Sequence, residues 1–388
     1  MENTNQFSGS PSQGSKTPAW ERFKIWAKTK NGKVTLVLLS ILLLALIAAG
    51  IVIYQRYFKK STDDSLVTGK VKTGETCVLE GTNVASNGNR HPLAVIIENH
   101  TQARPQVGLD KASVVYEAVS EGGITRFMAV YSCFDAERLG PVRSVRTYFL
   151  DWLSELNAFI AHCGGNIDAL DRIPQEGILD LDQFEYGEAA YWREPEAGKA
   201  SEHTLFTDTT KLYKIAQDNG WDMKGDFSSW KFKADAALDK RPDKEIIDVP
   251  FSGGSYAVKW VYNRDENQYA REIAGAAHND AKTGAQLKVK NVVVMEVNRH
   301  NSPTRINEAG YAMDTVGSGK AWFFIDGVKT EGTWNKASLK DRTIYKDSTG
   351  AEIKFDKGKT WIEVTPPEYP ISSEEGTMPT TSVNTTTQ

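Results

Sequence analysis

The sequence is poor in cysteine and histidine, and it has no marked excess of charge of either sign. Its 388 residues include 3 cysteines and 6 histidines, and 46 basic residues nearly balance 50 acidic ones. A net charge of only −4 gives no indication of a nucleic-acid partner. The cysteines are too few and too irregularly spaced for a disulfide scaffold or a zinc site, and the histidines lack chelating spacing, so we expect no metal and no cofactor. One disulfide could form outside the cell, and the sequence leaves open which two of Cys77, Cys133 and Cys163 would form it.

The common motifs of hydrolases and nucleotide-binding proteins are also missing. The chain has no Gly-x-Ser-x-Gly elbow and no His-Glu-x-x-His helix. The stretch Gly317–Lys320 resembles part of a phosphate-binding loop, but Asp314 stands where that motif needs its first glycine. Ala321 stands where serine or threonine should follow the lysine. A β-turn is therefore the better interpretation.

What the sequence does contain is one long apolar run, Val34–Tyr54, without a charged side chain. Its length matches the roughly 20 residues that cross a bilayer core and exceeds the about 7–15 apolar residues of a secretory signal. More lysines and arginines precede the run than follow it, which favours a cytoplasmic N-terminus. We therefore predict a single-pass protein of the cell membrane with its C-terminal region outside the cytoplasm.

Composition and periodicity divide the chain into six segments. They are a disordered, basic cytoplasmic tail (1–33), the membrane anchor (34–54), a stalk (55–89), an N-terminal α/β domain (90–235), a β-rich C-terminal domain (250–365) and a disordered tail (366–388). The predicted fold class is α+β, with an N-terminal mixed sheet covered by helices followed by a β-rich domain, behind one transmembrane helix.

Short apolar runs and helical patterns alternate in the first domain. We predict strands at 91–99, 114–119, 125–132 and 157–163, and helices at 143–156, 167–173 and from Thr207 or Asp208 to 217. The segment 175–201 has no period and is predicted to be a long loop. In the second domain, alternating runs and an Asp-Gly turn between 321–326 and 328–334 predict β structure.

The stretch Gly140–Gly165 is the strongest candidate for a functional site. Arg143 and Arg146 are three residues apart, so we expect both on one face of the first turn of the helix 143–156. Free backbone N–H groups there favour an anion, and arginine suits bidentate contact with carboxylate or phosphate. The expected ligand-binding residues are Arg104, Arg126, Arg143, Ser144, Arg146, His162 and His203, supported by Asn99, Glu117 and Glu121. An internal ion-pair network of these arginines with Glu117, Glu121 or Asp151 is an alternative of equal weight.

His162 and Cys163 are neighbours on a predicted strand, where successive side chains point to opposite faces. We therefore do not expect them to act as a catalytic pair, although Cys163 could use His203 as its base. A buried strand cysteine beside a hydrogen-bonded histidine is the plainer interpretation. Because His162 ends its strand, it could reach the same cavity as the two arginines.

Several blocks of sequence resemble the YerB-like family of bacterial envelope proteins from about Cys77 to Val364. They are HPLAVIIEN (91–99), ARPQVGL (103–109), VVYEAVSEGGITRF (114–127), LGPVRSVRTYF (139–149), AHCGG (161–165), His203, KNVVVMEV (290–297) and GTW (332–334). The resemblance implies two domains of unknown function outside a membrane, and no particular reaction. Many members look like lipoproteins held by an N-terminal cysteine. Here no cysteine ends the apolar run, so we expect the transmembrane helix to replace the lipid.

These observations predict a membrane-anchored extracytoplasmic protein that binds an anionic or carboxylate-bearing ligand of the cell envelope. One alternative is an enzyme that modifies an envelope polymer with His162 and His203 as acid–base groups. Another is a scaffold for a partner protein. The sequence leaves open whether a reaction is catalysed, and it does not identify the ligand.

Overall fold

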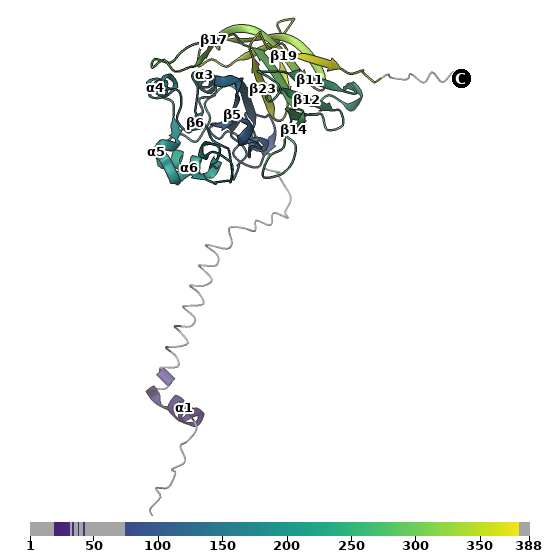
Figure 1. Cartoon of the computed structure of the whole chain (residues 1–388). Coiled ribbons are helices and arrows are strands. Elements are labelled where there is room, and N and C mark those ends of the chain that lie inside the picture. Colours follow the sequence, from purple (N-terminus) through teal and green to yellow (C-terminus); the bar gives the residue numbers. More distant parts are fainter. Residues whose placement is uncertain (1–18, 32, 35–37, 39–41, 43–73, 380–388) are drawn as a thin grey trace, which may run out of the picture. The chain divides into compact units, whose positions relative to one another are not determined.

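The computed structural model describes residues 19–31, 33, 34, 38, 42 and 74–379, which belong to two units, Met1–Lys72 and Thr73–Gln388 (Figure 1). Most of the predicted anchor 34–54 lies outside the described residues. Among those that are described, no helix combines the length and apolar character that a membrane span requires. The first unit contains the helix α1 (Ala19–Lys28), within the segment expected to be a disordered tail.

A ten-stranded mixed sheet forms the centre of the second unit, in the order β21-β20-β19-β16-β23-β4-β5-β3-β6-β7. The strands are β3 (Leu93–Glu98), β4 (Val114–Val119), β5 (Thr125–Tyr131), β6 (Phe159–His162), β7 (Asp180–Asp182), β16 (Asn291–Glu296), β19 (Gly317–Ile325), β20 (Val328–Lys336), β21 (Ile344–Asp347) and β23 (Thr360–Thr365). The parallel pair β4–β23 places Val114 beside Thr360, so both sequence regions build one sheet. The predicted α+β class is confirmed, whereas the predicted domain boundaries stay a prediction.

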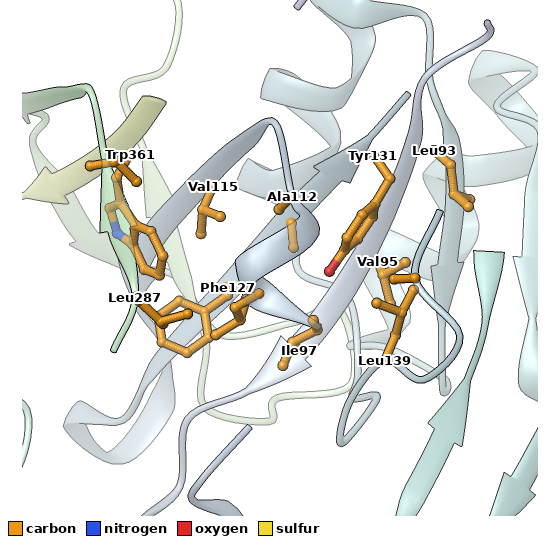
Figure 2. Close-up of a cluster of buried hydrophobic side chains, with 14 of the residues drawn as sticks. Leu93, Val95, Ile97, Ala112, Val115, Phe127, Tyr131, Leu139, Leu287 and Trp361 are labelled. Carbon is orange, nitrogen blue, oxygen red and sulfur yellow. The ribbon is translucent and has the colours of Figure 1, made fainter. Parts of the chain in front are cut away.

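The apolar runs of β3, β4 and β5 are buried on both faces of this sheet, as expected for strands without polar alternation. One face packs against α3 (Thr147–Leu156) and α4 (Ile167–Glu176), and Trp152 of α3 stacks on Tyr116 with ring centroids 5.4 Å apart. The other face packs against the second sheet and α6 (Thr209–Asp218). Figure 2 shows this second core, in which Phe127 meets Trp361 edge-on.

The second sheet is antiparallel and follows the predicted alternation of the C-terminal region. Its strands are β11 (Glu245–Val249), β12 (Val258–Asn263), β13 (Gln268–Ile273), β14 (Ala276–Ala277), β15 (Lys288–Val289) and β24 (Ser372–Glu375).

In the central sheet, β19 and β20 form the predicted hairpin. Asp326 and Gly327 take positive φ values of 56° and 75°, which suits a two-residue Asp-Gly turn.

Among the described residues, four small two-stranded sheets lie outside these two large sheets, with strands of two or three residues each. They are β1 (Glu75–Thr76) with β2 (Asn83–Val84), β8 (Tyr191–Arg193) with β9 (Leu205–Thr207), β10 (Lys231–Lys233) with β22 (Lys354–Asp356), and β17 (Arg299–Asn301) with β18 (Tyr311–Met313). The segment 175–201, expected to be a loop, instead contains β7, the helix α5 (Gln183–Ala190) and β8. Asp182 caps α5 by accepting a hydrogen bond from the backbone N–H of Phe184. This capping residue was a local signal for a helix, but the segment has no hydrophobic period and was therefore expected to be a loop.

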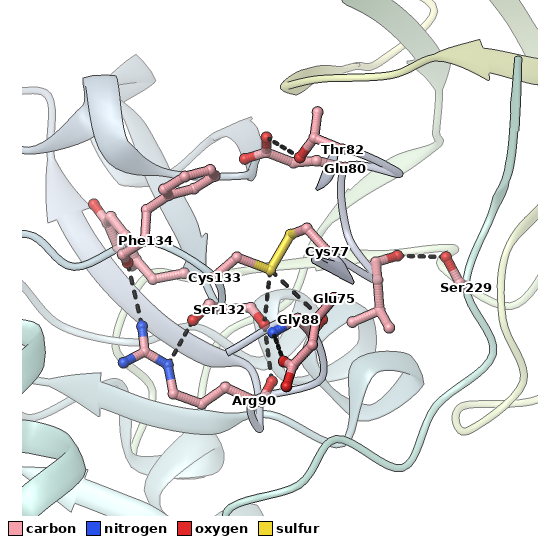
Figure 3. The surroundings of a disulfide bond; sticks show 12 residues. Glu75, Cys77, Glu80, Thr82, Gly88, Arg90, Ser132, Cys133, Phe134 and Ser229 are labelled. Carbon is pink, nitrogen blue, oxygen red and sulfur yellow. Dashed lines mark hydrogen bonds between the residues drawn. A yellow bond between two sulfur atoms is a disulfide. The ribbon is translucent and has the colours of Figure 1, made fainter. Parts of the chain in front are cut away.

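The end of the predicted stalk, from residue 74 onward, belongs to the second unit. Cys77 forms a disulfide with Cys133, which lies just after β5 (Figure 3). Cys77 and Leu79 are buried. This pairing, one of those that the sequence left open, leaves Cys163 as a free thiol. The predicted disordered tail likewise begins with an ordered strand, because β24 pairs with β11. Residues 55–73 and 380–388 lie outside the described part of the chain.

Candidate functional site

Most of the predicted site residues lie at one edge of the central sheet. The strands β3, β4 and β6 run in the same direction, so their carboxyl ends meet at that edge, where β5 begins with Thr125 and Arg126. Ligands of sheets with parallel strands favour this position. The segment that follows Gly140 lies across the same edge.

This segment is extended and does not form the predicted helix start. Val142 bridges to Ile97, and Val145 bridges to Gly165, so pairing with distant backbone holds the chain straight up to Arg146. The helix α3 begins only at Thr147. The prediction that Arg143 and Arg146 share the first helical turn is therefore wrong, and the anion site cannot be the one inferred from that turn.

Arg143 and His203 are instead joined by the carboxylate of Glu98. Nε of Arg143 donates to Oε1 of Glu98 at 3.0 Å, and Nδ1 of His203 lies 2.8 Å from Oε2 of the same residue. Glu98 and His203 are only 3% and 5% exposed. The ring of His100 stacks on the ring of His203, with the two centroids 4.8 Å apart. The sequence analysis did not identify Glu98 as a site residue, because Glu98 is the last residue of an apolar strand.

Arg146 is held by Glu121, the acidic residue of the β4–β5 turn. Its Nε lies 2.7 Å and 2.8 Å from the two carboxylate oxygens of Glu121. Burial alone would raise the pKa of Glu121, but the hydrogen bond and charge of Arg146 outweigh it and hold that pKa at about 2. This ion pair is one of those expected from the alternative of an internal network, whereas Asp151 pairs with Arg172 instead.

Arg126 lies next to this pair without a carboxylate of its own. It is 7% exposed, and among the described residues no carboxylate oxygen lies within ion-pair distance of it. Its Nη1 donates to the carbonyl oxygen of Ser144 at 2.8 Å, and its Nε has no hydrogen-bond partner. Burial and the nearby charge of Arg146 lower the pKa of Arg126 to about 10. We call Arg126, Arg143, Ser144 and Arg146, with Glu98 and Glu121, the arginine edge.

His162 lies behind the arginine edge with no exposed side-chain surface. Its Nε2 faces Asp180 and its Nδ1 faces the carbonyl oxygen of Gly164, so the ring cannot contact a ligand in this conformation. Cys163 has a different partner, Gln183, at 3.3 Å. Burial raises the pKa of the Cys163 thiol, which disfavours the thiolate that a nucleophile needs. In the described part of the chain, no hydrogen bond or ion pair links His162 or Cys163 to His203.

Asn99, Arg104 and Glu117 do not belong to the arginine edge, because they face the opposite side of the sheet. Asn99 accepts from Nε of Arg104 at 2.9 Å and donates to Glu117 at 3.3 Å. The carboxylate of Glu117 also accepts a hydrogen bond from Thr125 at 2.6 Å. These predicted ligand-binding and supporting residues therefore form part of a buried polar network.

The second sheet completes that network with residues that the sequence analysis missed. Arg271 and Glu117 form an ion pair in which neither side chain is exposed, and Arg271 also lies 4.7 Å from the ring centroid of Trp361. His278 accepts from Arg271 through Nδ1 at 2.6 Å and faces Gln106 through Nε2 at 2.8 Å. The sequence does contain one indication of Arg271. It is a charged residue at a position of an alternating strand where the side chain faces inward and an apolar residue is expected.

Several cavities of about 270 to 580 Å³ lie among the described residues. One, of about 390 Å³, is lined by His203, Pro141, Arg138 and Lys199 among others, and its cations are paired with Glu194 and Glu196. A larger one, of about 580 Å³, lies at the far end of α3 and contains none of the predicted site residues. Within the described residues, no cluster of three or more histidine, cysteine or acidic side chains could hold a metal ion.

Comparison with known proteins places both regions in one family. A family model described as the N-terminal domain of a protein of unknown function (DUF3048) matches residues 79–222, and the model of its C-terminal domain matches residues 247–362. "Putative lipoprotein YerB" of Bacillus subtilis is 28% identical over 282 residues, which cover 71% of this chain and 82% of the relative. The crystal structure of YerB from Bacillus subtilis matches with a TM-score of 0.68 and 25% identity, covering 79% of this chain and all of that one.

Proposed function

This chain belongs to the YerB-like DUF3048 family, whose function is unknown, and from its geometry we propose that it binds an anionic or carboxylate-bearing ligand of the cell envelope at the arginine edge. The exported side of a membrane is the proposed location. The relative is named as a lipoprotein, and a disulfide such as Cys77–Cys133 persists mainly in oxidising surroundings outside the cytosol. The predicted span 34–54 is the proposed anchor.

The absence of a carboxylate partner for Arg126 in the described residues is the observation that carries this proposal. Arg143 contacts Glu98 and, at 3.8 Å, Glu202, and Arg146 contacts Glu121. Arg126 is the guanidinium group of the arginine edge that has no carboxylate within ion-pair distance among the described residues. A buried charge without a directly paired carboxylate is unfavourable, and the more distant charges of Glu121 and Glu98 offset this cost only in part, because the pKa of Arg126 is still lowered. An incoming carboxylate or phosphate would neutralise Arg126 through charge-assisted hydrogen bonds.

The unit Thr73–Gln388 is compact by itself and suits a binding test. We would titrate it with oligogalacturonate, muramic-acid-containing peptidoglycan fragments and glycerol-phosphate polymer in a calorimeter. Arg126→Gln should weaken binding at least about tenfold, the loss expected for one charge-assisted contact. The matched control, Arg305→Gln, removes a half-exposed arginine paired with Asp171 and should leave affinity unchanged.

The two variants also separate a binding role from a structural one. If Arg126 serves only the ligand, Arg126→Gln removes an unpaired buried charge and leaves the melting temperature equal to or above that of the wild type. A fall in melting temperature together with unchanged affinity for every probe would reject the proposal.

An enzyme acting on an envelope polymer is a second candidate, because a carboxylate orients one histidine beside a cavity. Glu98 holds Nδ1 of His203, and His203 lines the cavity of about 390 Å³. Carboxylate–histidine pairs of this kind position general bases. His162 has no place in this version of the reaction because it is enclosed. Turnover of a polymer fragment that is lost in His203→Asn would support the enzyme; the same turnover in that variant would exclude it. A scaffold role stays a prediction.

A further inference from the structure

Helix α1 carries three large aromatic side chains that are exposed. Trp20, Phe23 and Trp26 are 61%, 43% and 40% exposed. They are spaced three residues apart, so they follow one another along one side of the helix. Their rings are in mutual contact, with centroids 5.9 Å apart for Trp20 and Phe23 and 5.8 Å apart for Phe23 and Trp26. We call these three residues the aromatic stripe.

Positive charge borders the aromatic stripe. Lys24 lies 5.0 Å from the ring of Trp20, and Lys28 follows one turn later. Lys30 and Lys33 come just after the helix, and both are exposed. Glu21 is the only acidic residue of the helix, so the helix and the residues after it have a cationic balance.

We propose that α1 lies in the plane of a membrane surface and binds anionic phospholipid headgroups, with the aromatic stripe inserted at the level of the headgroups. Ten residues are too few to cross a bilayer but suffice for an interfacial helix with an apolar side and a basic side. Tryptophan favours this depth because its ring is amphipathic. Lysines near an anionic surface each add favourable attraction. The apolar run that begins at Val34 would hold the helix next to the bilayer.

The helix itself supplies two matched positions for a test on the full chain. Ala27 comes four residues after Phe23 and so lies on the side of the stripe, whereas Ile25, 67% exposed, points to the other side. In a Cys163→Ser background, Ala27→Cys or Ile25→Cys would carry a nitroxide label. The full chain would be reconstituted into nanodiscs of phosphatidylcholine alone or with phosphatidylglycerol. Power saturation with oxygen and a water-soluble nickel chelate then reports depth.

With phosphatidylglycerol, nickel accessibility should be at least about threefold lower at Ala27 than at Ile25, because only the stripe side enters the bilayer. This difference should shrink in phosphatidylcholine alone and in Lys24→Glu/Lys28→Glu. Equal accessibility at the two positions would overturn the proposal, as would equal protection in both lipids or failure to associate with anionic nanodiscs. Dipolar broadening that protects Ala27 without any lipid would assign the stripe to a second copy of the chain and would also overturn it.

Discussion

His162 and Asp180 form a hydrogen bond of 2.9 Å between Nε2 and Oδ1 at the back of the arginine edge. On the other side of the ring, Nδ1 of His162 lies 2.8 Å from the carbonyl oxygen of Gly164. A carboxylate and a carbonyl oxygen both only accept, so both ring nitrogens must donate. These two contacts favour the imidazolium form of His162. Asp182, 3.6 Å from Nδ1, adds a second negative charge and caps α5 at the same time.

The first prediction is that this pair makes stability depend on pH. Burial alone would lower the pKa of His162, but the hydrogen bond and charge of Asp180, followed by the charge of Asp182, outweigh it and raise the pKa. The folded pKa thus exceeds that of the unfolded chain, about 6.5. The stabilisation is complete below pH of about 6.5 and is lost as pH rises through the folded pKa, at no more than about 1.4 kcal/mol per pH unit.

Chemical denaturation of the wild type and of His162→Asn between pH 5.5 and 9 measures this effect. Asparagine cannot carry the charge, so the wild type should be more stable at the acidic end and the difference between the two proteins should narrow as pH rises. A difference that stays constant across the range would contradict the imidazolium. Direct NMR titration of His162 is the independent check.

A second prediction concerns Glu245, whose two carboxylate oxygens are buried without a hydrogen-bond partner. Burial, followed by the charge of Glu375 on the paired strand β24, raises the pKa of Glu245 to about 7. Folding therefore disfavours the ionised form, and the destabilisation grows as pH rises from the unfolded pKa of about 4.3 to about 7. Glu245→Gln should raise the melting temperature at pH 8 and have little effect at pH 4. An equal effect at both values would show that ionisation plays no part.

A third prediction concerns the disulfide, which links residues separated by 56 positions. Closing a loop of that length should stabilise the folded chain by about 4 kcal/mol through loss of unfolded-state entropy. Cys77→Ser/Cys133→Ser should lower the free energy of unfolding by about that amount, and reductant should affect the wild type but not this variant. Cys163→Ser is the control. A loss below about 1 kcal/mol would contradict the stabilisation expected from closing this loop.

The strands were the most predictable part of this fold, since apolar runs such as Leu93–Glu98 and the Asp326-Gly327 turn act locally. The start of α3 was not predictable, because Val142 and Val145 are held straight by Ile97 and Gly165, partners distant in the sequence. The hydrophobic periodicity of a short segment contains no information about pairing with residues that are distant in the sequence. The same reason explains why Arg143 and Arg146 were expected on one helical turn.

The site was foreseen in its residue types but not in its grouping. Arg126, Arg143 and Arg146 do share one edge, whereas Arg104 and Glu117 face the other side of the sheet. Two facts decide this division: adjacent residues such as Glu98 and Asn99 point to opposite faces, and the second sheet covers one of those faces. The second fact depends on contacts between regions more than 100 residues apart, such as Glu117 with Arg271 at a separation of 154.

The last prediction tests that contact. Arg271 and Glu117 are fully buried, so removing one partner leaves an uncompensated charge, and Arg271→Met should lower the free energy of unfolding by about 3–5 kcal/mol. Adding Glu117→Gln removes the orphaned carboxylate and should recover part of the loss, which a double-mutant cycle quantifies. The pKa of His278 should rise in Arg271→Met, since the charge of Arg271 contributes, after burial, to lowering that pKa. Because the pair joins β4 to β13, we expect one cooperative unfolding transition in the wild type. Additive single losses would show that Arg271 and Glu117 do not stabilise each other, and two separate transitions would show that the two sequence regions unfold independently.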